Sequence, residues 1–91
     1  MPDYRLLSSA AGLLGTQEAV LCEFRDKGWL SVIERKGTTF LGAREQYKAK
    51  YILHLRDERG LTDDQITTVL ANQTPPYSSK DVDKILQSAQ A

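Results

Sequence analysis

The chain has 91 residues and no net charge at pH 7, because twelve basic side chains balance twelve acidic ones. This length bounds it to one small domain with a thin core. Its content of 41% hydrophobic and 26% charged residues is ordinary for a globular protein, so disorder is not expected. The chain has no apolar run of membrane-spanning length and no signal-peptide pattern, and its one cysteine excludes an internal disulfide. We therefore expect a cytoplasmic protein without membrane contact.

Two glycines thirteen residues apart, Gly15 and Gly28, bracket a predicted helix over residues 17–27. Thr16 is the predicted N-cap, because its hydroxyl can accept a hydrogen bond from a backbone amide of the first turn. Gly28 suits the left-handed position just past a helix end. The stripe expected to be buried contains Leu21 and Phe24.

An earlier helix is predicted from Leu7, Ala11 and Leu14, which repeat at helical spacing. The small side chains around Ala11 allow a second helix to approach closely. Two short helices joined by a turn that contains a glycine form the helix-turn-helix, which places its second helix in the major groove of DNA.

A β-hairpin is predicted after these helices. Residues 30–35 and 38–41 favour strands, and the Lys36-Gly37 pair between them allows the positive φ of a tight turn. Arg35 and Lys36 are expected to project at the tip. The pattern therefore predicts a two-stranded wing with a basic tip.

Two more helices are predicted downstream. The first covers residues 43–58 and ends at Gly60. Thr62 and Gln65 form a capping box that begins the second. The apolar face of the helix over residues 43–58 is expected to contain Tyr47, Tyr51, Ile52 and Leu55.

The C-terminal part divides at a Pro75-Pro76 pair, which breaks the helical pattern. We expect one domain over residues 1–72, a linker over 73–78 and a last helix over 79–91. This helix is too short to be stable alone, so it must pack on the domain, pair with a second copy or begin a longer helix. The predicted fold is mainly α: a winged helix-turn-helix with four to five helices and a two-stranded wing.

The residues at the core and turn positions resemble those of the MerR-type winged helix-turn-helix domain over about residues 5–71. The matching positions are Ala11, Gly15, Leu21, Phe24 and Gly28-Trp29-Leu30. The resemblance implies a DNA-binding protein whose second helix reads the major groove. Because such proteins generally carry a dimerising helix after this domain, it also implies a homodimer on double-stranded DNA.

The positions that read DNA in that family differ here. Its basic, hydroxyl and tyrosine side chains align with Ala19, Val20 and Glu23, its neighbouring arginine with Cys22, and its wing arginine falls near Thr39. The outer face of the second helix is therefore small and acidic. Two functions remain open. One is a DNA-binding transcriptional regulator or plasmid or phage DNA-maintenance factor, and the other is a protein-interaction module that has lost the DNA-reading face.

Charge favours the first function, because residues 25–59 carry nine basic and five acidic side chains, a local net charge of +4. A basic middle segment suits contact with phosphates. Gln17 and Glu18 can reach base edges from the start of the helix, and a glutamate can accept a hydrogen bond from a cytosine amino group. The predicted DNA-binding residues are Gln17, Glu18, Arg25, Arg35, Lys36, Thr38, Thr39, Arg44 and Lys48.

The sequence contains no constellation that indicates an enzyme. Phosphate-binding glycine loops, nucleophile motifs and metal-ligand spacings are lacking, so neither a cofactor nor a metal is expected. Cys22 has no nearby histidine or second cysteine, and His54 lies between two leucines without another ligand. The pair Asp63 and Asp64 is explained by the preference of carboxylates for a helix N-terminus.

Overall fold

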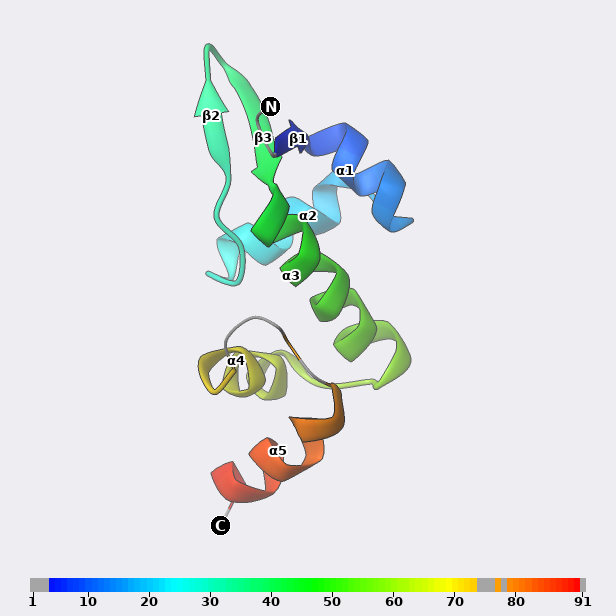
Figure 1. Cartoon of the computed structure of the whole chain (residues 1–91), viewed down its shortest axis with the longest axis vertical. Coiled ribbons are helices and arrows are strands. Elements are labelled where there is room, and N and C mark those ends of the chain that lie inside the picture. Colours follow the sequence, from blue (N-terminus) through cyan, green and yellow to red (C-terminus); the bar gives the residue numbers. More distant parts are fainter. Residues whose placement is uncertain (1–3, 74–76, 78, 91) are drawn as a thin grey trace. The chain divides into compact units, whose positions relative to one another are not determined.

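The computed structural model of the chain describes residues 4–73, 77 and 79–90. Within these residues the chain is mainly helical, with five α-helices and one three-stranded antiparallel sheet, which confirms the predicted fold class (Figure 1). Backbone contacts divide the chain into two compact units, Met1–Lys50 and Tyr51–Ala91, hereafter unit 1 and unit 2. The division falls inside one helix. In the described ranges, every helix is too short or too polar to span a membrane.

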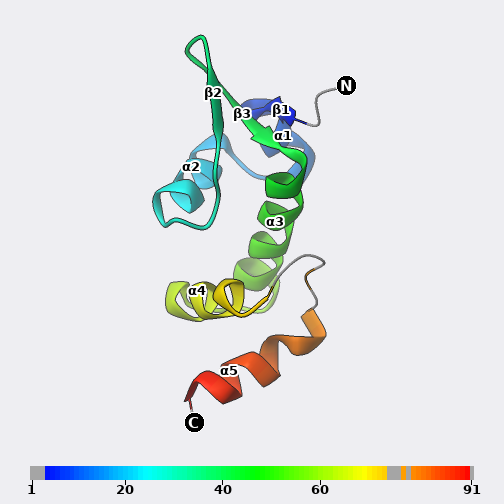
Figure 2. The ribbon, with the colours of Figure 1, turned by 60° about the vertical axis from the view of Figure 1, so that its left-hand side comes forward.

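Unit 1 contains the sheet and the helix-turn-helix. Its elements are β1 (Tyr4–Leu6), α1 (Leu7–Leu14), α2 (Glu18–Asp26), β2 (Ile33–Arg35), β3 (Thr38–Gly42) and the first residues of α3 (Ala43–Leu53). The strand order is β1-β3-β2, so β3 is central and pairs with both neighbours. Figure 2 shows the wing, which we define as β2, the Lys36-Gly37 turn and β3, with its tip beyond α1 and α2.

The third strand, β1, was not predicted, and the expectation of a two-stranded wing is corrected accordingly. A hairpin leaves one edge of β3 unpaired, and the chain fills this edge with its own N-terminal residues. Leu6 lies directly opposite Phe40, and the ring of Tyr4 meets that of Phe40 edge to face at a centroid distance of 5.0 Å. Three residues are too few to show the alternating pattern of a strand. Residues 4–6 form a strand because they pair with β3, which is distant in the sequence.

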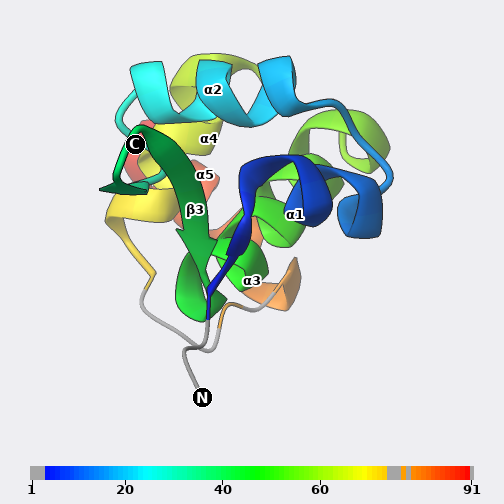
Figure 3. The same ribbon diagram turned by 90° about the horizontal axis from the view of Figure 1, so that it is seen from above.

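Figure 3 shows the turn between α1 and α2. Two backbone hydrogen bonds close this turn around Gly15, whose φ is +71°. The amide of Gly15 donates to the carbonyl of Gly12 at 3.2 Å, and the amide of Thr16 donates to that of Ala11 at 2.9 Å. Thr16 therefore completes the end of α1. The prediction that Thr16 is the N-cap of α2 is wrong. The N-cap is Gln17, whose side chain makes no capping hydrogen bond.

The end of α2 repeats this arrangement at Gly28, as predicted, with φ +80°. The amide of Trp29 donates to the carbonyl of Phe24 at 3.0 Å, and their rings lie 5.5 Å apart. This apolar contact commonly accompanies such a helix end. The buried core of unit 1 consists of Leu7, Ala10, Ala11, Leu21, Phe24, Trp29, Leu30, Leu41 and Ala49.

The strand β2 is shorter than predicted, because it begins at Ile33 and not at residue 30. The amide of Ser31 donates to the carboxylate of Glu45 at 2.6 Å, so this backbone group is not available to β3. Leu30 is buried outside the sheet. A side chain from α3 thus sets where the hairpin ladder starts.

Unit 2 consists of helices and turns. It contains the end of α3, a π-helical turn η1 (His54–Glu58), α4 (Asp63–Ala71), a 3₁₀ turn η2 (Ser79–Asp81) and α5 (Val82–Gln90). The predicted terminator Gly60 has φ +66°. The predicted capping box is present, because Thr62 and Gln65 each accept a hydrogen bond from the other's backbone amide. Most of the predicted linker, residues 74–76 and 78, lies outside the described residues.

The buried face of α3 differs from the prediction at Tyr47, whose residue surface is 53% exposed. Tyr51, Ile52 and Leu55 are buried as predicted, and Ala49, which was not predicted for this face, is buried too. Tyr47 precedes Ala49 by two residues, about 200° around a helix. In this part of α3 the core side is therefore that of the small Ala49, and not the opposite side, where the large Tyr47 lies.

Candidate nucleic-acid interface

The outward side of α2 is exposed, with the phase that the sequence predicted. Gln17, Glu18, Ala19, Glu23 and Asp26 are exposed and Cys22 is partly exposed, while Leu21 and Phe24 are buried. Gln17 and Glu18 lie at the start of the helix, as expected for contacts to base edges. Their side chains enter no ion pair or hydrogen bond in the described part of the chain.

The two cations of α2 and its end are paired with carboxylates of the same helix. Arg25 contacts Asp26 at 3.0 Å, and Lys27 contacts Glu23 at 3.5 Å. The hydrogen bond and charge of Asp26 raise the pKa of Arg25 above its ordinary value. The ammonium of Lys27 also lies 5.2 Å from the centroid of the Trp29 ring. Arg25, a predicted DNA contact, is thus already engaged within the helix.

The tip of the wing is a two-residue turn in which both residues have positive φ, +51° at Lys36 and +77° at Gly37. This combination defines the type I′ turn, whose twist matches that of paired strands. It is unusual at Lys36, because the left-handed conformation brings the Cβ of an L-residue close to the following carbonyl oxygen. The turn leaves Arg35, Lys36 and Thr38 exposed.

The register separates the predicted wing residues into two faces. Arg35 lies opposite Thr38 on one face, and Thr39 lies opposite Glu34 on the other. The guanidinium of Arg35 lies 5.9 Å from the centroid of the Tyr4 ring, a cation–π contact that connects β2 to β1 across β3. Sequence reasoning missed this contact, because it depends on the unpredicted strand.

The predicted cations of α3, Arg44 and Lys48, lie in unit 1 near the end of β3. Arg44 is exposed and Lys48 is half-buried. Among the described residues, neither these two side chains nor that of Lys36 has an ion pair or a hydrogen bond. Unit 1 therefore carries unpaired positive charge on the wing and on α3, and paired charge on α2.

The charges of the two units differ in sign. Unit 1 has eight basic and six acidic residues, a net charge of +2, whereas unit 2 has four basic and six acidic residues, a net charge of −2. The zero net charge of the chain thus conceals an excess of positive charge in the unit that carries the wing. An excess of this sign suits contact with phosphates.

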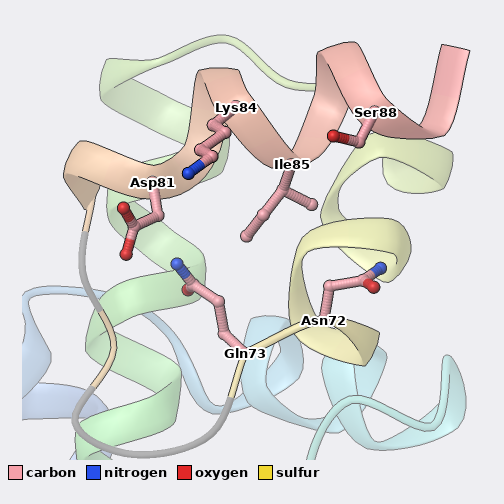
Figure 4. Close-up of a pocket in the computed structure, with 6 residues that line it drawn as sticks. All are labelled: Asn72, Gln73, Asp81, Lys84, Ile85 and Ser88. Atoms are coloured by element: carbon pink, nitrogen blue, oxygen red, sulfur yellow. The ribbon is translucent and has the colours of Figure 1, made fainter. Parts of the chain in front are cut away.

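Unit 2 has an open pocket of about 520 Å³ between the end of α4 and α5 (Figure 4). It is lined by Asn72, Gln73, Asp81, Lys84, Ile85 and Ser88. Asn72 donates to a carbonyl of α4 at 2.8 Å, and Gln73 accepts from the hydroxyl of Tyr51 at 2.6 Å. The charges of Asp81 and Lys84 cancel. The lining therefore has no charge excess that would select a phosphate or another ion.

The remaining chemical groups fit structural roles. His54 contacts Glu58 at 2.7 Å within the π-helical turn, and Cys22 is a free thiol. Burial raises the pKa of the Tyr51 phenol, whose ring stacks on Tyr77 at 5.0 Å. No group of three or more histidine, cysteine or carboxylate side chains in the described residues could hold a metal ion.

Comparisons of the chain with protein-family models, with curated proteins and with solved structures gave no match.

Proposed function

We propose that the protein binds double-stranded DNA, with the wing tip on the phosphate backbone and the start of α2 at the base edges. The observation that carries this proposal is the pair of adjacent, exposed cations at the tip, Arg35 and Lys36. Neither has an acidic partner in the described residues, so binding would break no existing ion pair. Phosphates provide such a partner, and each contact releases counterions from the DNA.

The conformation of Lys36 adds support. A type I′ turn favours asparagine, aspartate or glycine at this position, and lysine with positive φ costs on the order of 1 kcal/mol. The chain bears this cost at the most projecting point of the wing. A positive charge that contacts phosphate gives the lysine a function that offsets its unfavourable conformation.

The start of α2 offers the groups for reading bases. Gln17 and Glu18 are exposed, and the Gln17 side chain is free because it does not cap the helix. A glutamine amide can pair with adenine, and a glutamate can accept from the amino group of cytosine. The proposed biological role is a transcriptional regulator or a DNA-maintenance factor, as the MerR-type resemblance implies.

A second candidate function is a protein-interaction module. It is favoured by α2, whose outward side carries Glu18, Glu23 and Asp26, with its two cations held by its own carboxylates. This side repels phosphate, so only its first residues can serve a DNA complex. We rank DNA binding first because the wing and α3 provide unpaired positive charge in the same unit.

The test is a titration of labelled mixed-sequence duplex DNA at several salt concentrations. The double variant Arg35→Ala with Lys36→Ala should lower the slope of log K against log salt by about 2, because two phosphate contacts are lost. It should weaken binding to all sequences alike. The matched control is Lys80→Ala with Lys84→Ala, which removes the same charge from unit 2 and should leave the slope unchanged.

Two outcomes would contradict the proposal. If the wild-type protein does not bind at micromolar concentration and low salt, the protein-interaction function takes its place. If the wing variant and the control lower the slope equally, binding depends on total charge and not on the wing.

A further inference from the structure

The sheet of unit 1 has an apolar face on the side opposite the buried Leu41. The register places Leu6 and Ile33 directly opposite Phe40, so three apolar side chains form one row across the three strands. The ring of Tyr4 packs against Phe40 on the same side. Leu6 is 44% and Ile33 is 36% exposed. We call this surface, with Arg35 at its border, the outer sheet face.

The polar and apolar side chains of this sheet lie on the opposite faces from those usually found. An antiparallel sheet with one packed face normally presents polar side chains to water on the other. Here the polar residues Arg5, Glu34 and Thr39 share the side of Leu41, and the apolar row lies on the opposite side. Apolar side chains that gather on an exposed face indicate an interaction surface.

The positive charge at the border of the outer sheet face restricts which protein surfaces can bind there. Arg35 shares the face and lies over the Tyr4 ring, and Lys36 follows it at the wing tip. The strand residues on this face include no acidic side chain. A complementary surface must therefore offer carboxylates together with small or apolar side chains.

The outward side of α2 has this composition. Glu18 and Glu23 are exposed on it, with the small side chains of Ala19 and Cys22 between them. Glu23 is already paired with Lys27 at 3.5 Å, so among the described residues Glu18 is the carboxylate of the two without a partner. Because the side chains of Ala19 and Cys22 are short, the apolar row of a sheet can approach the helix closely while Arg35 reaches Glu18.

The outward side of α2 lies opposite its buried residues Leu21 and Phe24, and the outer sheet face lies opposite the buried Leu41. Both surfaces therefore point away from the core of unit 1, so the contact requires a second copy.

We propose that copies of this chain associate head to tail, with the outer sheet face of one copy on the outward side of α2 of the next. A contact between two different surfaces leaves one of each free at the ends, so association continues beyond a dimer unless it closes into a ring. A row of three apolar side chains on one surface and two short side chains on the other place the contact among weak interfaces, with dissociation constants roughly in the range of tens to hundreds of micromolar.

The test is sedimentation of the full chain without DNA, from about 10 to 500 µM. The average mass of the wild-type protein should rise with concentration, and it should rise less at high salt because the charges are screened. Ile33→Asp disables the sheet face, and Glu18→Lys with Glu23→Lys disables the α2 side. Each variant alone should remain a monomer. Leu6→Ser, at the other end of the apolar row, should weaken association as a second sheet-face variant.

An equimolar mixture of the two disabled variants gives the decisive result. Ile33→Asp keeps an intact α2 side, and the glutamate variant keeps an intact sheet face, so the mixture should form a one-to-one dimer and nothing larger. Heterodimer formation also shows that both variants fold. A wild-type mass independent of concentration would overturn the proposal, as would a monomeric mixture of variants with native circular dichroism.

Continued self-association of the glutamate variant alone would likewise overturn it, by indicating a symmetric contact of two sheet faces. The proposal does not rest on DNA binding. Since no DNA is present, failure here leaves the proposed function unaffected, and failure of the DNA titration leaves this contact unaffected.

Discussion

The wing carries two cations, and so does α2 together with its C-cap residue Lys27, but the two regions hold them differently. Arg35 and Lys36 project from the wing without an acidic partner, whereas Arg25 and Lys27 are bound to Asp26 and Glu23. A charge count along the sequence treats the two pairs as equal. For a phosphate ligand they are unequal, because a paired cation must first give up its partner.

The inner side of α2 should show the largest effect, because this helix contributes chiefly through packing. Phe24 is 1% exposed and lies against Trp29. Phe24→Ala should lower the free energy of unfolding by about 3–5 kcal/mol. Leu13→Ala, at a position 67% exposed on α1, is the control and should cost less than about 0.5 kcal/mol in denaturant unfolding. A loss below about 1 kcal/mol at Phe24 would mean that the phase of α2 is misassigned.

Substitutions at the start of α2 should alter the sequence preference of DNA binding and leave its salt dependence nearly unchanged. Glu18→Ala or Gln17→Ala should change the preference for one base pair by roughly 1–3 kcal/mol, with a nearly constant salt slope. This base-pair preference is measured by competition with duplexes that carry single base-pair changes. Lys36→Ala is the contrasting variant and should weaken all duplexes alike. Uniform weakening by all three variants would remove the distinction between a reading helix and a positioning wing.

Neutralising two carboxylates of α2 should release its cations for contact with phosphates. Glu23→Gln with Asp26→Asn leaves Lys27 and Arg25 without these partners. DNA affinity should rise by about fivefold and the salt slope should steepen by about 1 to 2. The control is Asp57→Asn with Glu58→Gln, which neutralises two ion-paired carboxylates in unit 2. Equal affinities for wild type and both variants would show that this side of α2 does not approach phosphate.

The smallest effect concerns Lys36, where stability and binding should change in opposite directions. Lys36→Asn relieves the left-handed conformation and should stabilise the protein by about 0.5 kcal/mol, roughly 2–4 °C in melting temperature. The same change should weaken DNA binding several-fold. Thermal unfolding of the Lys36→Asn variant measures the change in stability, and DNA titration of the same variant measures the change in affinity. A variant that is both more stable and equally tight would remove Lys36 from the interface.

Features with a local physical cause were predictable from the sequence. Glycines at positive φ ended α2 and η1 and formed the wing turn, and the Thr62–Gln65 capping box began α4. Each depends on a few adjacent residues with strong conformational preferences. The same holds for the buried stripe of α2.

Features that depend on distant partners were not predictable. The strand β1 exists because β3 has a second edge, and the shortened β2 reflects the hydrogen bond from Ser31 to Glu45. For the candidate interface, the exposed positions followed from periodicity. The pairing of Arg25 depends on side-chain geometry, and the support of Arg35 by Tyr4 depends on the missed strand.

The position of β1 has a consequence for the order of folding. The β2–β3 hairpin joins neighbouring residues, whereas pairing of Leu6 with Phe40 encloses residues 7–39, which include α1 and α2. Closing a loop of this length costs entropy before any contact rewards it, so such pairing forms late. On a ribosome, β1 must wait until β3 has emerged. In native-state hydrogen exchange, the amides of β1 should therefore open before those of the hairpin.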